Sequence, residues 1–231
     1  MSSLDPQFKI TGHRGAPVYA PENTLKSFQK AFECGATAIE FDVRVTADGV
    51  PVILHDESLE RIAGVRKFVA EISFEGLREV KVGGEKIPTL EEVLAFAKGK
   101  LAVDIEVKVP GVEEKVVDLV KKYGLVEETL ITSFIPGVLS RIKEIEPRLR
   151  VGILSSEWDD EYLDIASSLN AYALLPNYSF IDEEVVKKAK AWGYRLIVWT
   201  VNSVEDIRKM LSLGVDGIIT DDPCRAREII G

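Results

Sequence analysis

The chain contains only two histidines, His13 and His55, and they lie in the sequence on either side of an acidic pair, Glu40 and Asp42. An imidazole, with an ordinary pKa of about 6.5, can accept or donate a proton near neutral pH. Neighbouring carboxylates can hold a divalent cation. Two proton-transfer groups flanking a carboxylate pair are what metal-assisted cleavage of a phosphodiester would require. The spacing of these four residues is therefore the first indication of function.

Acidic side chains alternate with apolar ones in two predicted strands. Glu40, Asp42 and Arg44 share one strand face, and the opposite face is apolar. Residues 101–108 repeat the pattern, with Asp104, Glu106 and Lys108 on one face. Carboxylates that point into a protein are costly unless a cation or hydrogen bonds compensate them.

Three of these acids, Glu40, Asp42 and Glu106, form a candidate metal site, with Asp104 lying deeper. An all-carboxylate set suits one hard divalent cation, Mg²⁺ or Ca²⁺, better than Zn²⁺, which prefers more histidine or cysteine. The structural alternative is a closed network of ion pairs with the cations of the same two strands. The placement of both histidines beside the acids favours the metal site.

Strand-like and helical runs alternate along most of the chain, which indicates βα units and a parallel sheet. The predicted strands are Phe8–His13, Thr37–Val45, Pro51–His55, Leu101–Val107, Thr129–Ser133, Arg150–Leu154, Tyr172–Leu175, Arg195–Thr200 and Gly217–Thr220. The predicted helices are Thr24–Cys34, Leu90–Ala97, Val112–Tyr123, Pro136–Ile145, Asp159–Ser168, Asp182–Trp192 and Val204–Leu213.

The second and third strands are too close in sequence for a crossover helix, so the third is predicted to return antiparallel. The other eight would close a (β/α)8 barrel, the α/β TIM-barrel class, as a single domain of residues 1–231. A two-residue turn at Asp48-Gly49 would place His55 opposite Asp42, with Glu40 diagonal to it. Residues of about 57–86 break the βα rhythm and are predicted to form a small cap on the barrel mouth.

Composition narrows the class of partner. The net charge is -9, so a basic surface for nucleic acid is not expected, and a small-molecule substrate is favoured. Neither a secretion signal nor a membrane-spanning run is visible, and no stable membrane insertion is expected. Cys34 and Cys224 provide no disulfide framework, which predicts a reduced, cytoplasmic chain. Residues 1–7 are interpreted as a loose lead-in, and the oligomeric state is left open.

Several separated motifs resemble those of the glycerophosphodiester phosphodiesterase family over nearly the whole chain. The residues that carry the resemblance are His13-Arg14-Gly15, Pro21-Glu22-Asn23-Thr24, Glu40-Phe41-Asp42-Val43, His55-Asp56, Ile87-Pro88-Thr89-Leu90, Glu106-Val107-Lys108, Val198-Trp199-Thr200-Val201-Asn202 and Thr220-Asp221-Asp222-Pro223. The family has the (β/α)8 fold, with a small inserted cap after the second histidine.

The resemblance implies hydrolysis of a glycerophosphodiester to glycerol phosphate and an alcohol. It implies that Glu40, Asp42 and Glu106 bind one divalent cation and that His13 and His55 form the acid–base pair. Arg14 and Lys108 would contact the phosphate. We interpret His13 as the base and His55 as the acid, with the reverse assignment open. Direct attack by water and a route through a cyclic phosphate also remain open.

Three further positions are predicted to support the site. Trp199, at the end of a strand, would form an aromatic wall for the substrate. Asn23 would lie just behind the site near the start of the first helix. Asp56 would orient or brace the hairpin. Asp221 and Asp222 are interpreted only as caps of the final helix, and not as ligands.

Competing functions make different predictions. A phospholipase C- or D-like enzyme would act on lysolipids, but no amphipathic docking segment is visible in the sequence. A non-catalytic phosphate-binding protein would shift its melting temperature with ligand and show no metal-dependent turnover. A carbon–carbon lyase would give no reason for two histidines.

Overall fold

The computed structural model of the protein describes residues 9–231 and shows an eight-stranded parallel barrel surrounded by helices. The lead-in at residues 1–7 and Phe8, the first residue of the first predicted strand, lie outside the described residues. The barrel strands are β1 (Lys9–Gly12), β2 (Ala38–Val45), β6 (Ala102–Val107), β7 (Thr129–Ser133), β8 (Arg150–Ser155), β9 (Ala173–Pro176), β10 (Arg195–Val198) and β11 (Gly217–Thr220). Pairing of β1 with both β2 and β11 closes the ring, so the predicted TIM-barrel class is confirmed.

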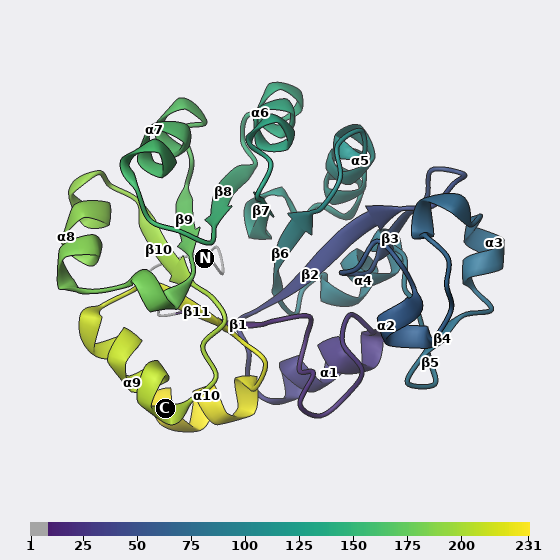
Figure 1. The fold of residues 1–231 in the computed structure, drawn as a ribbon, viewed down its shortest axis with the longest axis horizontal. Coiled ribbons are helices and arrows are strands. Elements are labelled where there is room, and N and C mark those ends of the chain that lie inside the picture. Colours follow the sequence, from purple (N-terminus) through teal and green to yellow (C-terminus); the bar gives the residue numbers. More distant parts are fainter. Residues whose placement is uncertain (1–8) are drawn as a thin grey trace.

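Helices form the outer layer of the barrel (Figure 1). They are α1 (Leu25–Glu33), α4 (Leu90–Ala97), α5 (Glu113–Tyr123), α6 (Pro136–Ile145), α7 (Asp160–Ser168), α8 (Glu183–Ala191), α9 (Val204–Leu213) and α10 (Pro223–Ile230). Short 3₁₀ turns occur at η2 (Val126–Glu128) and η3 (Tyr178–Phe180). Each predicted helix is present, because its apolar stripe can be buried against the strands.

Strand alternation divides the buried residues of the barrel into two sets. Ile39, Phe41 and Val43 of β2 are fully buried between the sheet and the helices. The barrel interior is apolar along β7 to β11, where Leu154 and Leu175 pack together with Ile219. On the β2 and β6 side, the interior residues are instead acidic. The buried acids Glu40, Asp42, Asp104 and Glu106 thereby lie on two neighbouring strands of the barrel.

β3 (Pro51–Ile53) pairs antiparallel with β2, as predicted, but the register differs from the prediction. Val43 lies opposite Ile53, and the Leu54 amide donates to the Asp42 carbonyl, so position 42 faces position 54 instead of 55. The turn has three residues instead of two. The Thr46 amide donates to Val50 O, and Gly49 takes a φ of 79°. This is the three-residue loop with a glycine in the left-handed region.

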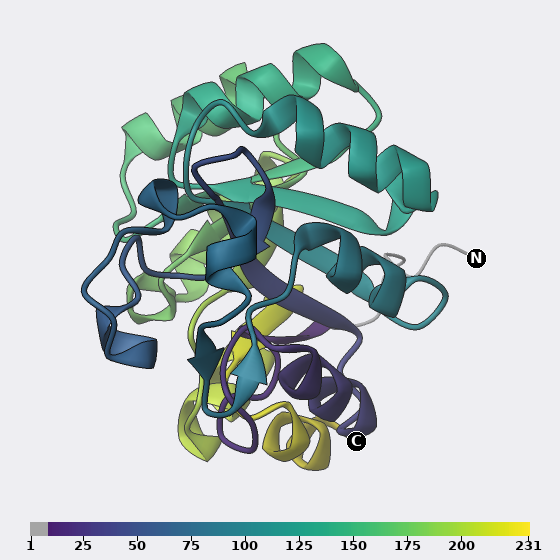
Figure 2. The ribbon, with the colours of Figure 1, turned by 90° about the vertical axis from the view of Figure 1, so that its right-hand side faces the viewer.

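The insertion after this hairpin forms the cap, on the right of Figure 1 and facing the viewer in Figure 2. It contains α2 (Glu60–Ala63), η1 (Val69–Glu71), α3 (Phe74–Leu77), β4 (Lys81–Val82) and β5 (Glu85–Lys86). A small apolar core of its own joins the cap to β3, with Leu59 and Val69 packed against Val52. The cap is therefore attached to the hairpin that leads to His55.

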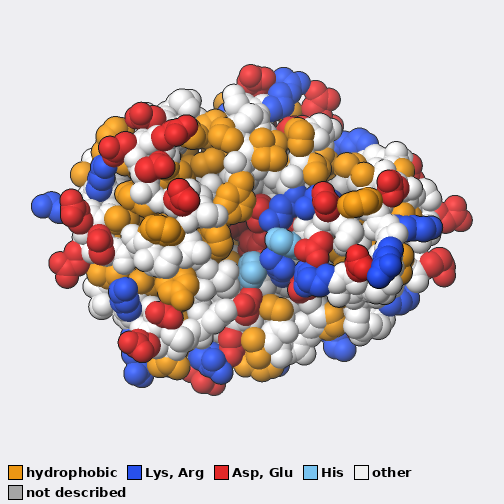
Figure 3. All heavy atoms as spheres, in the orientation of Figure 1, with side chains coloured by type: hydrophobic (Ala, Val, Ile, Leu, Met, Phe, Trp, Pro, Cys, Tyr) orange, Lys and Arg blue, Asp and Glu red, His pale blue; other side chains and the backbone are white. Residues whose placement is uncertain are grey.

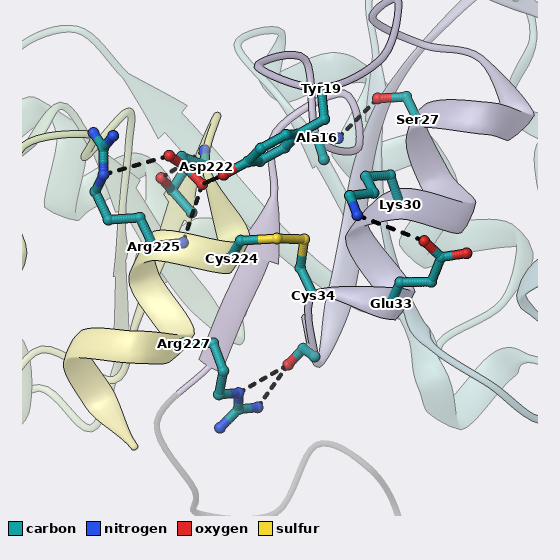
Figure 4. Close-up of a disulfide and its surroundings, with 12 residues drawn as sticks. Ala16, Tyr19, Ser27, Lys30, Glu33, Cys34, Asp222, Cys224, Arg225 and Arg227 are labelled. Atoms are coloured by element: carbon teal, nitrogen blue, oxygen red, sulfur yellow. Dashed lines mark hydrogen bonds and ion pairs between the residues drawn. A yellow bond between two sulfur atoms is a disulfide. The ribbon is translucent and has the colours of Figure 1, made fainter.

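Cys34 and Cys224 form a disulfide, so the prediction that both cysteines are reduced is wrong. Cys34 follows α1 and Cys224 lies in the first turn of α10, at a sequence separation of 190 (Figure 4). Arg227 of α10 donates to Gly35 O beside the bond. Two lone cysteines so far apart give no spacing pattern, and barrel closure alone brings them together. A cytoplasmic location stays a prediction.

Candidate active site

The run His13-Arg14-Gly15 directly follows β1 at the mouth of the barrel. Arg14 has a φ of 52° and Gly15 a φ of 92°. A Cβ on Gly15 would lie 2.4 Å from Ser27 Oγ, so only glycine fits against α1. The left-handed backbone at Arg14 aims its amide at the Glu40 carboxylate, with 2.8 Å between N and Oε2. The backbone of this loop is therefore locally strained, and the strained conformation places the Arg14 amide against Glu40.

The three predicted metal ligands come together. In the parallel register, Glu40 is paired with Asp104 and Asp42 with Glu106. Glu40, Asp42 and Glu106 are all buried, and each offers one carboxylate oxygen within 4.8 Å of the others. Asp104 lies one step deeper and accepts a hydrogen bond from Thr132 Oγ1 at 2.7 Å. Burial raises the pKa of Asp104 to about 7.

Arg14 and Lys108 reach into this acidic cluster. Lys108 Nζ lies 3.0 Å from Asp42 Oδ1 and 2.5 Å from Glu106 Oε1. Burial opposes ionisation of Asp42, but Lys108 and Arg14 outweigh it and hold the pKa of Asp42 below its ordinary value. Burial, and then the neighbouring Asp42 charge, raise the pKa of Glu40 well above its ordinary value. Arg14 and Lys108 therefore do not fully compensate the repulsion among the buried carboxylates.

The residues fit a divalent cation better than a closed ion-pair network. Glu40 Oε1 is buried and has no hydrogen-bond partner within the described chain. Arg44, a possible partner in such a network, instead donates from Nε to His55 O at 2.7 Å. A buried carboxylate oxygen without a partner is costly. A hard cation would compensate this oxygen and the repulsion among the three acids.

His55 follows the end of β3 and reaches the same pocket despite the shifted register. Its Nδ1 lies 2.7 Å from Asp56 Oδ1. Burial lowers the pKa of His55 even though Asp42 and Asp56 act in the opposite direction. Asp56, predicted to orient or brace the hairpin, contacts the imidazole itself.

His13 has a carboxylate partner that the sequence interpretation missed. Its Nδ1 lies 2.6 Å from Asp221 Oδ1, although the sequence separation of the two residues is 208. Asn202 Nδ2 donates to Asp221 Oδ2 at 2.6 Å, and its Oδ1 accepts from the Asp221 amide. Asp222 alone caps α10, accepting from the Arg225 amide. The prediction that Asp221 is only a helix cap is therefore wrong. The signal available in the sequence was that Asn202 and Asp221 each lie in a motif that resembles the family.

Asn23 lies behind the acids, as expected. It adopts a φ of 57° and donates from Nδ2 to Asp42 Oδ2 at 2.8 Å. The next residue, Thr24, caps α1 by accepting from the Ser27 amide. Glu22, on the other side of Asn23 in sequence, was given no role in the sequence analysis. Its Oε1 accepts a hydrogen bond from Arg14 Nη1 at 3.0 Å. This turn therefore fixes the positions of both Asp42 and Arg14.

The two histidines, the two cations Arg14 and Lys108, and the acids Glu40, Asp104 and Glu106 line a pocket of about 270 Å³. Figure 3 shows the two histidines in the central hollow, with acidic and basic side chains beside them. The opposite wall is apolar and includes Trp199, whose ring meets Phe134 edge to face at 5.7 Å. Trp199 Nε1 donates to Leu175 O, which fixes the indole at the mouth. The pocket thus combines a charged wall with an aromatic one.

Comparisons with known proteins agree with this arrangement. The model of the glycerophosphoryl diester phosphodiesterase family matches residues 13–225. A glycerophosphodiester phosphodiesterase of Caldanaerobacter subterraneus subsp. tengcongensis is 38% identical over 228 residues, covering 93% of this chain and 94% of the relative. Another from Bacillus altitudinis is 34% identical, covering 96% and 97%.

A solved structure of an Oleispira antarctica phosphodiesterase, in complex with the product sn-glycerol-3-phosphate, is 27% identical and has a TM-score of 0.92. The match covers 100% of this chain and 99% of that one. Among residues 9–231, no helix is both long and apolar enough to cross a membrane.

Proposed function

Because this chain belongs to the glycerophosphoryl diester phosphodiesterase family, we propose that it hydrolyses glycerophosphodiesters to glycerol phosphate and an alcohol in a reaction that depends on one divalent cation. The substrate would be a small, water-soluble diester. The observation that carries the proposal is a cluster of three buried carboxylates, two of which, Glu40 and Glu106, line the same pocket as both imidazoles.

Glu40, Asp42 and Glu106 are the residues that would hold the cation. Bound there, Mg²⁺ or Ca²⁺ would supply positive charge to a non-bridging phosphate oxygen. The unpartnered Glu40 oxygen supports this assignment. Asn23 would keep Asp42 in place through its amide hydrogen bond.

Arg14 and Lys108 would bind the phosphate. Both line the pocket, and both are anchored by acids of the cluster. Fixed cations aimed at the phosphate stabilise charge that grows on its oxygens during the reaction. Trp199 would pack against the uncharged part of the substrate.

The two imidazoles would transfer the protons, with His13 as base and His55 as acid. A carboxylate on each Nδ1 favours the tautomer with its proton on Nδ1, which leaves Nε2 free for proton transfer. Asp56 would hold His55 in this way, as the Asp–His pair does in other hydrolytic sites.

Turnover of glycerophosphocholine tests the proposal. We expect release of glycerol phosphate that EDTA abolishes and that Mg²⁺ or Ca²⁺ restores. Glu40→Gln should lose at least about 100-fold in kcat/KM, because a ligand is removed. Activity that is unaffected by EDTA and by Glu40→Gln would contradict the metal site. Turnover of a long-chain lysolipid, with none of glycerophosphocholine, would favour the alternative of a phospholipase C- or D-like enzyme that acts on lysolipids.

A diester with a p-nitrophenol leaving group separates the roles of the histidines. A good leaving group needs no acid, so His55→Ala should retain more activity on it than on glycerophosphocholine. His13→Ala should lose activity on both substrates. The opposite pattern would reverse the assignment, and a cyclic phosphate in quenched reactions would establish attack by the neighbouring hydroxyl.

A further inference from the structure

Arg61, in the cap helix α2, connects the two halves of the pocket. Its Nε donates to Asp56 Oδ2 at 2.6 Å, and its Nη2 donates to Asp56 Oδ1 at 3.2 Å. The far edge of the same guanidinium binds Glu22, with Nη1 to Oε2 at 3.0 Å and Nη2 to Oε1 at 2.7 Å. One planar group thus holds two carboxylates, each by two hydrogen bonds, which is a geometry that only arginine provides.

Each of these carboxylates continues to a residue that lines the pocket. Asp56 Oδ1 lies 2.7 Å from His55 Nδ1. Glu22 Oε1 accepts from Arg14 Nη1 at 3.0 Å. An unbroken line of contacts therefore runs from His55 to Arg14, and it passes through a side chain of the cap.

The backbone beside Arg61 is fixed by the cap. Leu59, which precedes α2, is fully buried in the cap core, and its amide donates to Lys67 O. Gly64 ends the helix in the left-handed region, with a φ of 68°. The Arg61 side chain is 49% exposed, so its ion pairs contribute little to the free energy of unfolding. Their effect is to fix the orientation of the Asp56 and Glu22 carboxylates.

We propose that Arg61 is a positioning residue, which clasps Asp56 and Glu22 so that the cap sets the orientation of both His55 and Arg14. We call Arg61, Asp56 and Glu22 the clasp. The kinetic part of this inference depends on the proposed function. Without the guanidinium, the two carboxylates of the clasp repel each other and each keeps only its partner in the pocket.

Kinetics of Arg61 variants test the clasp. Arg61→Gln should lower kcat at least about tenfold through His55 and raise KM at least about threefold through Arg14. Arg61→Lys keeps the charge but cannot hold both carboxylates in paired geometry, so it should recover only part of the loss. Added guanidinium should partly restore Arg61→Ala. The matched control is Arg66→Gln, because Arg66 pairs with Glu60 and its side chain is 87% exposed.

Separate variants of Asp56 and Glu22 distinguish the contact to His55 from the contact to Arg14. Asp56→Asn should mainly lower kcat, and Glu22→Gln should mainly raise KM. If Arg61→Gln lowers only the melting temperature, with kinetic constants like those of Arg66→Gln, the clasp is merely structural and the proposal is overturned.

A second readout does not depend on activity. The chain has only two histidines, so ¹⁵N spectra of the imidazoles resolve each one. Arg61→Gln should loosen the His55 tautomer preference and leave the His13 signals unchanged, since Asp221 holds His13 independently. Unchanged His55 signals in Arg61→Gln would overturn the clasp. Absence of turnover in the wild type would count only against the proposed function, because the spectra test the clasp without any activity.

Discussion

At the scale of single residues, the two imidazoles share one device. Each Nδ1 contacts an aspartate, Asp221 for His13 and Asp56 for His55. Asn202 holds Asp221 by two hydrogen bonds, donating to its carboxylate and accepting from its backbone amide. The burial of Asp221 opposes its ionisation, but His13, Asn202 and Arg14 together outweigh this and keep the pKa of Asp221 below its ordinary value. Asp221 is therefore an ionised acceptor that can orient His13.

We expect Asp221→Asn to lower kcat by at least about tenfold, because an amide no longer dictates which imidazole nitrogen carries the proton. The measurement is kcat on glycerophosphocholine together with the melting temperature. Asp222→Asn is the matched control, since asparagine also caps a helix and this residue does not line the pocket. Equal kinetic losses in both variants would assign the effect to charge near α10 instead of to His13.

At the scale of elements, the β2–β3 hairpin decides where His55 lies. The turn after Thr46 has three residues and needs Gly49 at a φ of 79°. Any other residue in this conformation is strained. The loop also anchors the cap, because Asp48 accepts a hydrogen bond from the Phe74 amide. A single turn thus positions both the imidazole and the segment that carries Arg61.

Gly49→Ala should lower the free energy of unfolding by about 1 kcal/mol, through the strained φ and the displacement of the Lys115 side chain, whose Nζ would lie 2.6 Å from the added Cβ. Urea unfolding measures this loss. Gly99→Ala is the control, because Gly99 has a φ of 73° and open space around its Cα but lies away from the pocket. Both variants should lose stability, and only Gly49→Ala should also lower kcat/KM. A fully stable Gly49→Ala would show that the turn adopts another form.

At the scale of the whole molecule, the disulfide joins the first and last helices of the barrel. It lies next to other contacts between the two ends of the chain, including the hydrogen bond from Tyr19 to Asp222 (Figure 4). These bonds close the barrel at the seam between α10 and α1. The β1–α1 loop that carries His13 and Arg14 is adjacent to this seam.

Replacing both cysteines by serine should lower the free energy of unfolding by about 3 to 5 kcal/mol, because a cross-link over 190 residues restricts the unfolded chain strongly. Thermal unfolding with and without a reductant measures the effect. The reductant should lower the melting temperature of the wild type and leave the double variant unchanged. A wild type that is insensitive to reductant would mean that the bond does not form in solution.

The order of elements and the candidate ligands were readable in the sequence. Alternation in residues 37–45 and 101–108 places the acids on one face, because side chains of a strand alternate by geometry alone. The hairpin register was not readable, since Asp48-Gly49 suits both two- and three-residue loops. That one-residue difference changed the predicted partner of Asp42 from His55 to Leu54.

The sequence by itself therefore determined the (β/α)8 class, the three metal-ligand candidates and the two histidines, because these depend on local periodicity and residue type. Only the tertiary structure decided the contacts between distant segments. Asp221 reaches His13 across 208 residues, and Cys224 reaches Cys34 across 190. Arg61 meets Glu22 from a different element. Such pairs have no local pattern, since closure of the barrel and docking of the cap bring them together.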